Sequence, residues 1–309
     1  MSAGRHEIRE GTPLAWSERR TDDLDRILPS REEGRRTRIL GILNLTPDSF
    51  HDGGADSSPA GAVARGRQLV AEGADALDLG AESTRPDADP VPEAEELDRL
   101  LPVLDGLRDA GVPLSVDTTK ARVADEALRR GATLVNDVSG LQRDEEIAAV
   151  CARHDAGLVL MHMRGEPRTM RSLADYRDVV EETLRFLEER IDLAVRLGVP
   201  ERNLIVDPGL GFAKSVDHNL RILRRLPEYL TLGRPVLVGA SRKSFLARYD
   251  GAASEDRLEA TLATSTLAVI GGASILRVHD VRANRRAVLL TESVLGARDP
   301  GRSGEASAC

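Results

Sequence analysis

The sequence predicts an α/β protein built as a single (β/α)8 barrel, the TIM-barrel architecture. Short apolar runs alternate with longer helical patterns about eight times between Arg38 and Leu295. This span of roughly 260 residues is the usual size of such a barrel. The chain has 309 residues, of which 41% are hydrophobic and only 3% aromatic, so small aliphatic side chains must fill the core, as they do in the layered interior of a parallel barrel.

The first unit shows the pattern that the others repeat. Its apolar run, Ile39 to Leu43, is typical of a strand buried on both faces, and at Asn44 it turns into a polar loop containing Gly53 and Gly54, which suit a hinge. The seven further strands are expected at residues 75–79, 113–116, 133–135, 157–160, 204–206, 235–238 and 274–276. The helices whose limits are best marked are expected at residues 60–72, 121–130, 144–154 and 175–197, and another helix is expected between Pro92 and about Ala110.

The barrel is expected to span residues 37–297, between an N-terminal extension of residues 1–36 and a C-terminal tail of residues 298–309. Within the charged extension, Leu24, Ile27 and Leu28 are spaced to form one amphipathic turn that docks on the body. We expect both terminal segments to be dispensable for activity. A doubly wound open sheet is the alternative fold, disfavoured because neither GxGxxG nor GxxxxGK[ST] follows the first strand.

Composition excludes several classes of function. The net charge of −8 disfavours nucleic acid and anionic membranes as partners, because both attract clustered basic charge. Cys151 and Cys309 are the two cysteines, too few for a disulfide framework or a CxxC metal site, and this favours a reducing cytoplasm. The sequence has no membrane-spanning run and no signal-peptide pattern. HExxH and GxSxG are also absent, which leaves zinc hydrolysis and acyl-serine chemistry without support.

Polar side chains follow nearly every predicted strand, and in a barrel all these strand ends share one mouth. The candidate site residues are Asn44, Thr84, Arg85, Asp117, Asn136, Asp207, Ser241, Arg242, Lys243, Arg277 and His279. One group of them, Asp117, Asn136, Asp207 and Lys243, suits a flat nitrogen heterocycle with amide and amino edges. A second group, Arg85, Arg277 and His279, presents N–H donors suited to a phosphate or diphosphate.

Several candidates also have an ordinary structural interpretation. Asp117 fits the N-cap of the helix that follows it, and Asn136 fits a residue that satisfies loop backbone. The Ser241–Lys243 run fits a basic surface turn. Asp280 fits the cap of the last helix, with the basic groups before it solvated. Asp207 resists such an interpretation, because Pro208 and two glycines make a rigid turn in which no helix begins.

Eight strings in a fixed order make the chain resemble the dihydropteroate synthase family from about Arg38 to Leu295. They are GILNLTPDSF with DGG, ESTRP, SVDTTK, ND at 136–137, MHMRG, DPGLGF with Lys214, GASRKS and RVHD. The resemblance implies a barrel, usually dimeric, that joins 6-hydroxymethyl-7,8-dihydropterin diphosphate to 4-aminobenzoate, releasing diphosphate and forming 7,8-dihydropteroate in tetrahydrofolate biosynthesis. It also implies that sulfonamides inhibit the protein.

The resemblance assigns roles by matching position. Asp117, Asn136, Asp207 and Lys243 would hold the pterin, Arg277 and His279 the diphosphate, and Asn44 the Mg²⁺. Thr84, Arg85, Pro86, Phe50, Phe212 and Ser241 would complete the aminobenzoate pocket. Asp117, Asp207, Lys243 and Arg277 are therefore the expected catalytic residues. Two rival functions stay open at this point: a pterin-dependent corrinoid methyltransferase, and a paralogue that binds pterin without catalysing the reaction.

Overall fold

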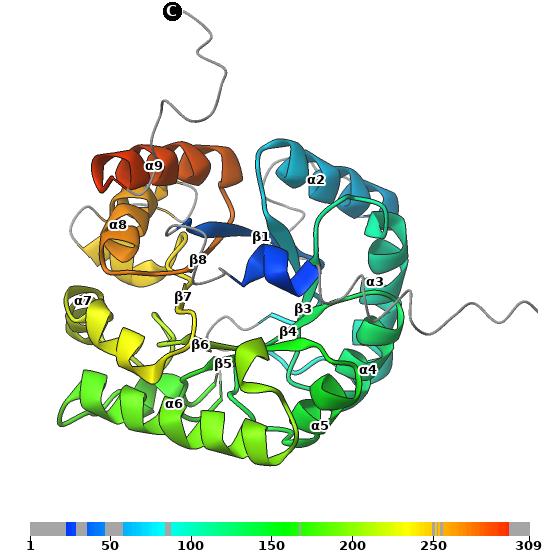
Figure 1. Ribbon diagram of the computed structural model, residues 1–309, viewed down its shortest axis with the longest axis horizontal. Coiled ribbons are helices and arrows are strands. Elements are labelled where there is room, and N and C mark those ends of the chain that lie inside the picture. The colour runs from blue at the N-terminus through cyan, green and yellow to red at the C-terminus, as the bar shows by residue number, and fades with distance from the viewer. Residues whose placement is uncertain are drawn as a thin grey trace, which may run out of the picture.

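A ring of helices surrounds eight parallel strands in the computed structural model (Figure 1), which describes residues 23–28, 36–46, 58–83, 88–166, 168–248, 251, 253 and 256–296. The strands are β1 Arg38–Asn44, β2 Ala76–Gly80, β3 Leu114–Asp117, β4 Leu134–Asp137, β5 Gly157–Met161, β6 Leu204–Asp207, β7 Leu237–Val238 and β8 Ile275–Val278. Their order is β6-β5-β4-β3-β2-β1-β8-β7, and a parallel bridge between Val206 and Val236 joins the two ends. The sheet is therefore a closed (β/α)8 barrel, as predicted.

One α-helix follows each strand, and a 3-10 turn precedes the helix after β5 and after β7. The helices are α2 Pro59–Ala71, α3 Glu93–Leu107, α4 Ala121–Arg129, α5 Glu146–Arg153, α6 Val179–Arg196, α7 Val216–Arg224, α8 Leu258–Ile270 and α9 Val281–Val294. Short 3-10 turns are η2 Met170–Leu173, η3 Glu201–Asn203, η4 Leu226–Leu232 and η5 Ser244–Arg248. Within the described part of the chain, no helix has the length and apolar character needed to cross a membrane.

Side-chain caps set the starts of several helices. Asp178 accepts hydrogen bonds from the amides of Val180 and Glu181, so α6 begins at Val179 and not near residue 175 as the periodicity predicted. Ser215 caps α7 through the amide of His218, whose side chain bonds back to the Ser215 amide. These caps satisfy amides that have no partner within their helix.

Most strands run one or two residues further than predicted at their carboxyl ends. Asn44, Asp117, Asn136 and Asp207 are thus strand residues, and Arg277 lies inside β8. The reason is that ladder hydrogen bonds join backbone groups, so a polar side chain does not end a strand when it points into the mouth. The candidate residues consequently stand on the rigid barrel wall.

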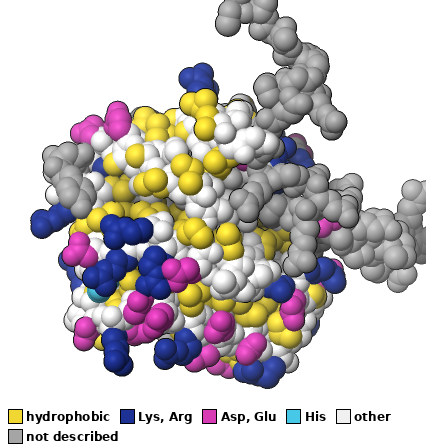
Figure 2. All heavy atoms as spheres, turned by 60° about the vertical axis from the view of Figure 1, so that its left-hand side comes forward, with side chains coloured by type: hydrophobic (Ala, Val, Ile, Leu, Met, Phe, Trp, Pro, Cys, Tyr) yellow, Lys and Arg dark blue, Asp and Glu magenta, His cyan; other side chains and the backbone are white. Residues whose placement is uncertain are grey.

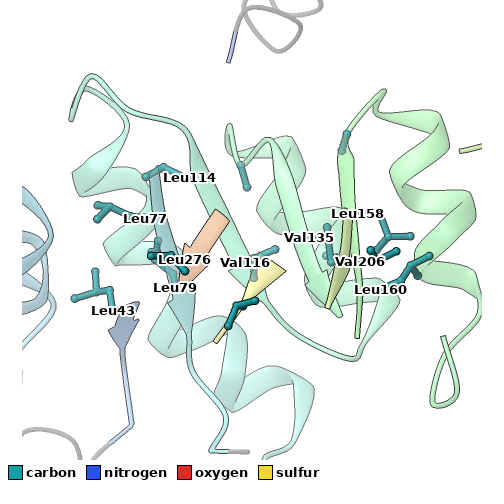
Figure 3. Packing of buried hydrophobic residues seen from close by; sticks show 14 of the residues in the cluster. Leu43, Leu77, Leu79, Leu114, Val116, Val135, Leu158, Leu160, Val206 and Leu276 are labelled. Atoms are coloured by element: carbon teal, nitrogen blue, oxygen red, sulfur yellow. The ribbon is translucent and has the colours of Figure 1, made fainter. Parts of the chain in front are cut away.

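The apolar core has two parts. The larger part fills the space between the outer faces of the strands and the helices, where Leu77, Leu79 and Val116 pack (Figure 3). The smaller part closes the inside of the barrel at the amino ends of the strands, and we call it the floor. It contains Ile27, Leu40, Ala76, Leu134, Val159, Ile205, Leu237 and Ile275.

The N-terminal extension contributes to the floor. Residues 23–27 form a helical turn, drawn in dark blue across the barrel in Figure 1. Leu24 is 4% exposed and Ile27 is 1% exposed. The amphipathic turn predicted here therefore docks on the barrel, and this part of the extension belongs to the core. That burial argues against the expectation that residues 1–36 are dispensable.

Candidate active site

One continuous rung of backbone pairing positions the first half of the mouth. Asn44 pairs with Gly80, Gly80 with Asp117, and Asp117 with Asn136, so the ends of β1 to β4 lie level. Because alternate residues of a strand face the same side, Asp78 lies one step below Gly80 on the inner wall. Sequence-distant polar groups are thereby brought to one level of the barrel.

Arg277 is the hub of this wall. Its Nε donates to Asp78 Oδ2 at 2.6 Å, and its Nη2 donates to Asp117 Oδ2 at 2.6 Å. Asn136 Nδ2 donates to the same Asp78 oxygen at 3.0 Å. Asp78 is fully buried and the other three side chains are largely buried. The four groups form one connected, charge-assisted network from β2, β3, β4 and β8.

Burial shifts the protonation of the acidic groups. It raises the pKa of Asp117 to about 7, against the opposing effect of the Arg277 cation, and the nearby Asp78, Glu96 and Asp137 carboxylates act in the same direction as burial. Burial also raises the pKa of Asp207, opposed by Lys243. For Arg277, burial alone would lower the pKa, but Asp78 and Asp117 outweigh it and hold the guanidinium charged.

A glycine turn aims Asp207 into the mouth. The Gly209 amide donates to Asp207 Oδ1 at 2.7 Å, and Gly209 has a positive φ of 70°. A Cβ built on Gly209 would lie 2.0 Å from the carbonyl oxygen of His162, so no larger residue fits without moving the backbone. The DPG sequence therefore folds into a fixed turn, as its composition predicted.

Lys243 stands opposite this turn. Its Nζ donates to the Leu210 carbonyl and lies 4.4 Å from the centre of the Phe212 ring, a cation–π contact. Burial lowers the pKa of Lys243 to about 8, with the Asp207 carboxylate opposing the shift. The side chain is thus a cation whose charge is sensitive to pH in the neutral range.

The β7 and β8 tips meet at a second basic wall. Ser241 Oγ lies 3.1 Å from His279 Nδ1 and accepts from the His279 amide at 3.2 Å. Arg242 has a positive φ of 58° and donates to both oxygens of Asp280. Asp280 occupies the N-cap position of α9, but its side chain makes no capping hydrogen bond and its carboxylate accepts from Arg242 instead.

A hollow open to solvent adjoins these groups at Asp117 and Phe212. Its lining is Glu82, Ser83, Asp117, Thr118, Thr119, Val138, Arg143, Met163 and Phe212. The lining thus combines carboxylate, hydroxyl and guanidinium groups with the apolar side chains of Val138, Met163 and Phe212. A small planar molecule with hydrogen-bonding edges suits such a wall.

The structure brings most of the predicted site residues to this mouth: Asn44, Asp117, Asn136, Asp207, Phe212, Ser241, Lys243, Arg277 and His279. Thr84, Arg85, Pro86, Phe50, Gly53 and Gly54 lie outside the described residues. The interpretation of Asp117 as an N-cap is wrong, because Lys120 occupies the N-cap position of α4 without a side-chain cap. Asp117 instead accepts from Arg277.

Two members of the mouth, Asp78 and Lys120, escaped sequence reasoning. Asp78 lies inside a predicted strand, although a lone acid in the apolar run ALDLG is a usable signal. Lys214, named with the DPGLGF motif, lies 2.9 Å from His162 Nδ1 and donates to the Phe212 carbonyl at 3.0 Å. Lys120 pairs with Glu82 and Glu96, which are 38 and 24 residues away in sequence. No local sequence pattern predicts ion pairs between residues so far apart in the chain.

Comparisons with known proteins agree with this geometry. A family model described as pterin binding enzyme matches residues 40–279. The dihydropteroate synthase of Synechocystis sp. is 47% identical over 252 residues, 81% of this chain and 87% of the relative. The structure of Xanthomonas albilineans dihydropteroate synthase with 4-aminobenzoic acid has a TM-score of 0.79 at 44% identity, covering 84% of this chain and 93% of that one. The Thermus thermophilus dihydropteroate synthase in complex with 6HMPPP has a TM-score of 0.73 at 48% identity, covering 84% and 94%.

Fold, mouth and family model together define the class, a pterin-binding enzyme built on a (β/α)8 barrel. Within that class, the chain belongs to the dihydropteroate synthase family, whose members are transferases. This membership answers the methyltransferase alternative that the sequence left open.

Proposed function

We propose that the chain condenses 6-hydroxymethyl-7,8-dihydropterin diphosphate with 4-aminobenzoate, giving 7,8-dihydropteroate and diphosphate in tetrahydrofolate biosynthesis. The observation that carries the proposal is the network in which Arg277 joins Asp78 and Asp117, with Asn136 beside them. It offers acceptors and donors to a heterocycle and a cation to an anionic group. The relatives bound to 4-aminobenzoic acid and to 6HMPPP support this choice of substrates.

The pterin would lie against Asp117, Asn136, Asp207 and Lys243. Carboxylates accept from ring N–H and amino groups, whereas the Asn136 amide both donates and accepts. Lys243 donates to ring acceptors and, over the Phe212 ring, closes one side of the slot. The buried setting makes each of these hydrogen bonds electrostatically stronger than it would be in water.

The diphosphate would lie at the β7 and β8 tips, between Arg277 and His279. Arg277 has a planar fork of donors suited to phosphate oxygens, and His279 is held by Ser241. Binding of the diphosphate requires Arg277 to share its donors between the new anion and the Asp78 and Asp117 carboxylates. The guanidinium has enough N–H groups to serve both.

Mg²⁺ fits the donors available at this mouth. The described residues contain no group of three His, Cys, Asp or Glu side chains able to cage a metal. Mg²⁺, however, commonly takes one protein oxygen and completes its shell with water and substrate phosphate. Asn44, at the end of β1 and partly exposed, would supply that oxygen. The ion, when bound, would neutralise charge on the diphosphate and so improve it as a leaving group.

The chemistry needs no covalent enzyme nucleophile. The bond between the exocyclic pterin carbon and the diphosphate oxygen breaks with its electron pair going to diphosphate, while the amine of 4-aminobenzoate bonds to that carbon and then loses a proton. Arg277 and His279 stabilise the charge on the departing oxygens, and the ionised Asp207 stabilises positive charge on the pterin. Phe212 and Ser241 would contact the aminobenzoate, together with Thr84, Arg85, Pro86 and Phe50.

The test is diphosphate release by the purified protein with dihydropterin diphosphate and Mg²⁺, with and without 4-aminobenzoate. We expect release coupled to dihydropteroate formation, and its loss in Arg277→Ala. Binding of pterin without either product would contradict the proposal and favour the non-catalytic paralogue.

We further propose that the protein is a homodimer and that α8 and α9 form its interface. Figure 2 shows hydrophobic side chains gathered over this side of the molecule. Leu290 and Val294 on α9 are 68% and 78% exposed, and Leu267 and Ile270 on α8 are more than half exposed. Light scattering tests the assembly: Leu290→Glu should yield monomers, whereas Leu197→Glu, an exposed leucine after α6, should leave dimers.

Two expectations remain to be tested in cells. Sulfonamides should inhibit growth that depends on this gene alone. The reason is that residues 80–92, which follow the second strand, contain no inserted Phe–Gly pair of the kind found in drug-resistant relatives. Resistant growth would refute this expectation. A cytoplasmic location, with which the buried free thiol of Cys151 is compatible, should appear on fractionation.

A further inference from the structure

The chain uses lysine at only three of its 43 Lys and Arg positions. These are Lys120, Lys214 and Lys243, which follow β3, β6 and β7 at the mouth. An ammonium is a compact charge with three donors, and a guanidinium is a larger planar fork, so the two are not interchangeable in a confined site. The three lysines therefore place compact cations at the mouth. Lys243 would bind the pterin in the proposed reaction, and Lys214 donates to the Phe212 carbonyl. Lys120 belongs to neither of these contacts.

Lys120 bridges two glutamates. Its Nζ lies 2.5 Å from Glu82 Oε2 and 2.5 Å from Glu96 Oε2. The three side chains are only 19%, 11% and 1% exposed in the order Lys120, Glu82, Glu96. Buried carboxylates need a matching cation, because an unpaired one costs several kcal/mol. The bridge is thus a buried, three-membered ionic contact and not a solvated surface pair.

The two glutamates stand at opposite ends of the connection between β2 and α3, residues 81–92. Glu82 comes two residues after β2, and Glu96 lies in the first turn of α3. Glu82 Oε1 also accepts from the Val91 amide at 3.2 Å, near the far end of the connection. Lys120 itself is three residues beyond Asp117, so the bridge ties the connection to the tip of β3.

The protonation of the bridge agrees with its geometry. Burial raises the pKa of Glu96, and Lys120 acts against that shift. Burial would lower the pKa of Lys120, but the hydrogen bonds that its ammonium donates to both glutamates outweigh burial and raise the pKa instead. The lysine therefore stays charged at neutral pH and continues to hold both carboxylates.

We propose that Lys120 is a positioning residue that fixes both ends of the β2–α3 connection against the mouth and thereby sets the affinity for 4-aminobenzoate. This rests on the proposed function. Glu82 and Ser83, at the start of the connection, line the hollow beside Asp117 and Phe212 that would receive the aminobenzoate. Lys120 acts on this lining through Glu82, and Glu96 holds the lysine from the first turn of α3.

The test compares Lys120→Met with Arg122→Met. Arg122 is a matched control because it also pairs with a glutamate in the first turn of α3, Glu93, at 3.6 Å, but both side chains are exposed. In Lys120→Met we expect faster amide hydrogen exchange across residues 81–92 and a KM for 4-aminobenzoate raised about tenfold or more, with the affinity for the pterin diphosphate changed less than about threefold. Arg122→Met should change none of these.

A second variant keeps the test decisive if Lys120→Met fails to fold. Lys120→Met with Glu96→Gln removes one uncompensated charge, and it should fold while retaining the raised KM for 4-aminobenzoate. Unchanged exchange, an equal rise in the constants for both substrates, or the same effects in Arg122→Met would overturn the proposal. If the wild-type protein makes no dihydropteroate, the proposed function fails on its own, and the exchange comparison still decides whether Lys120 fixes the connection.

Discussion

The two ends of the barrel are built from the same strands and have opposite chemistry. At the floor, Leu40, Leu134 and Ile205 pack with Ile27 of the N-terminal turn, and all are buried. At the mouth, Asp117 at the end of β3 and Asp207, two residues beyond Ile205 on β6, are buried as carboxyl groups. Burial of apolar surface stabilises the fold, whereas burial of charge opposes it unless a partner compensates.

The difference implies a division of labour between the ends. The floor should set the free energy of unfolding with little influence on activity, and the mouth should do the reverse. The mouth can hold unfavourable charge because the floor and the outer core supply the stability. Variants matched between the two ends test this division of labour.

The largest effect is expected at Arg277. Arg277→Ala removes the cation proposed for the diphosphate and should lower kcat/KM by about a thousandfold. Its counterpart at the floor end is Arg285, which donates to Asp75 and to the Gly73 carbonyl and is also largely buried. Arg285→Ala should lower the midpoint of thermal unfolding but leave kcat/KM per folded molecule within about threefold of wild type. Comparable activity losses in both variants would contradict the division of labour.

The next effect concerns the N-terminal turn. Ile27→Ala should lower the free energy of unfolding by about 2–4 kcal/mol, because it opens a cavity in the floor, and should leave kcat/KM unchanged. Urea unfolding followed by circular dichroism measures the loss. Removal of residues 1–35 deletes Leu24 as well and should destabilise more. If the shortened chain matched the full chain in stability, the expectation that the extension is dispensable would hold and the floor would not need this turn.

The fold was predictable because its signals are local. Apolar runs such as Ile39 to Leu43 and the polar residues that follow them reveal a strand and its tip without knowledge of the rest of the chain. The barrel then brings such tips together, so Asp117, Asp207 and Arg277 could be placed in one mouth before the structure was known. The predicted start of α6 was too early, because the helical periodicity of the sequence continues on the N-terminal side of Asp178. The Asp178 side chain caps the first turn, so the helix begins at Val179.

The partners inside the mouth were not predictable. Whether Asp117 capped α4 or faced the barrel depended on Arg277, which is 160 residues away. Asp78 is joined to Arg277 across 199 residues. The strand pattern reports only that a residue lies in a strand, and which acids meet which cations depends on the register and closure of the sheet.

An intermediate effect is expected from pH. The pKa of Asp117 is raised to about 7 in the free protein. As the pH falls below this value, the Asp117 carboxylate is protonated and can no longer accept two hydrogen bonds from the pterin. Pterin binding should therefore weaken by up to about tenfold per pH unit below pH 7, and it should weaken again above about pH 8 as Lys243 loses its charge. Titration calorimetry from pH 5.5 to 8.5 measures this, and Asp117→Asn should flatten only the acid side of the profile.

The same group has the opposite influence on stability. Because its folded-state pKa is raised above the ordinary value of 3.8, the stability that it contributes is fully present below about pH 4 and is lost as the pH rises through about 7. Asp117→Asn should remove that pH dependence as well. Binding and folding that both improve with rising pH would contradict the assignment of the shift to Asp117.

The smallest effect tests whether every part of the mouth is dedicated to activity. Ser215 follows Lys214 directly and caps α7 through the His218 amide at 3.2 Å, so it serves the fold although it stands beside the site. Ser215→Ala should lower the free energy of unfolding by about 1 kcal/mol without changing kcat/KM. Ser293 is the control: its hydroxyl bonds the Leu289 carbonyl within α9 and is exposed, so Ser293→Ala should have almost no effect. A fall in kcat/KM for Ser215→Ala would mean that the α7 cap also positions the Asp207 to Lys214 turn, and the boundary between stability and activity would then pass through α7 itself.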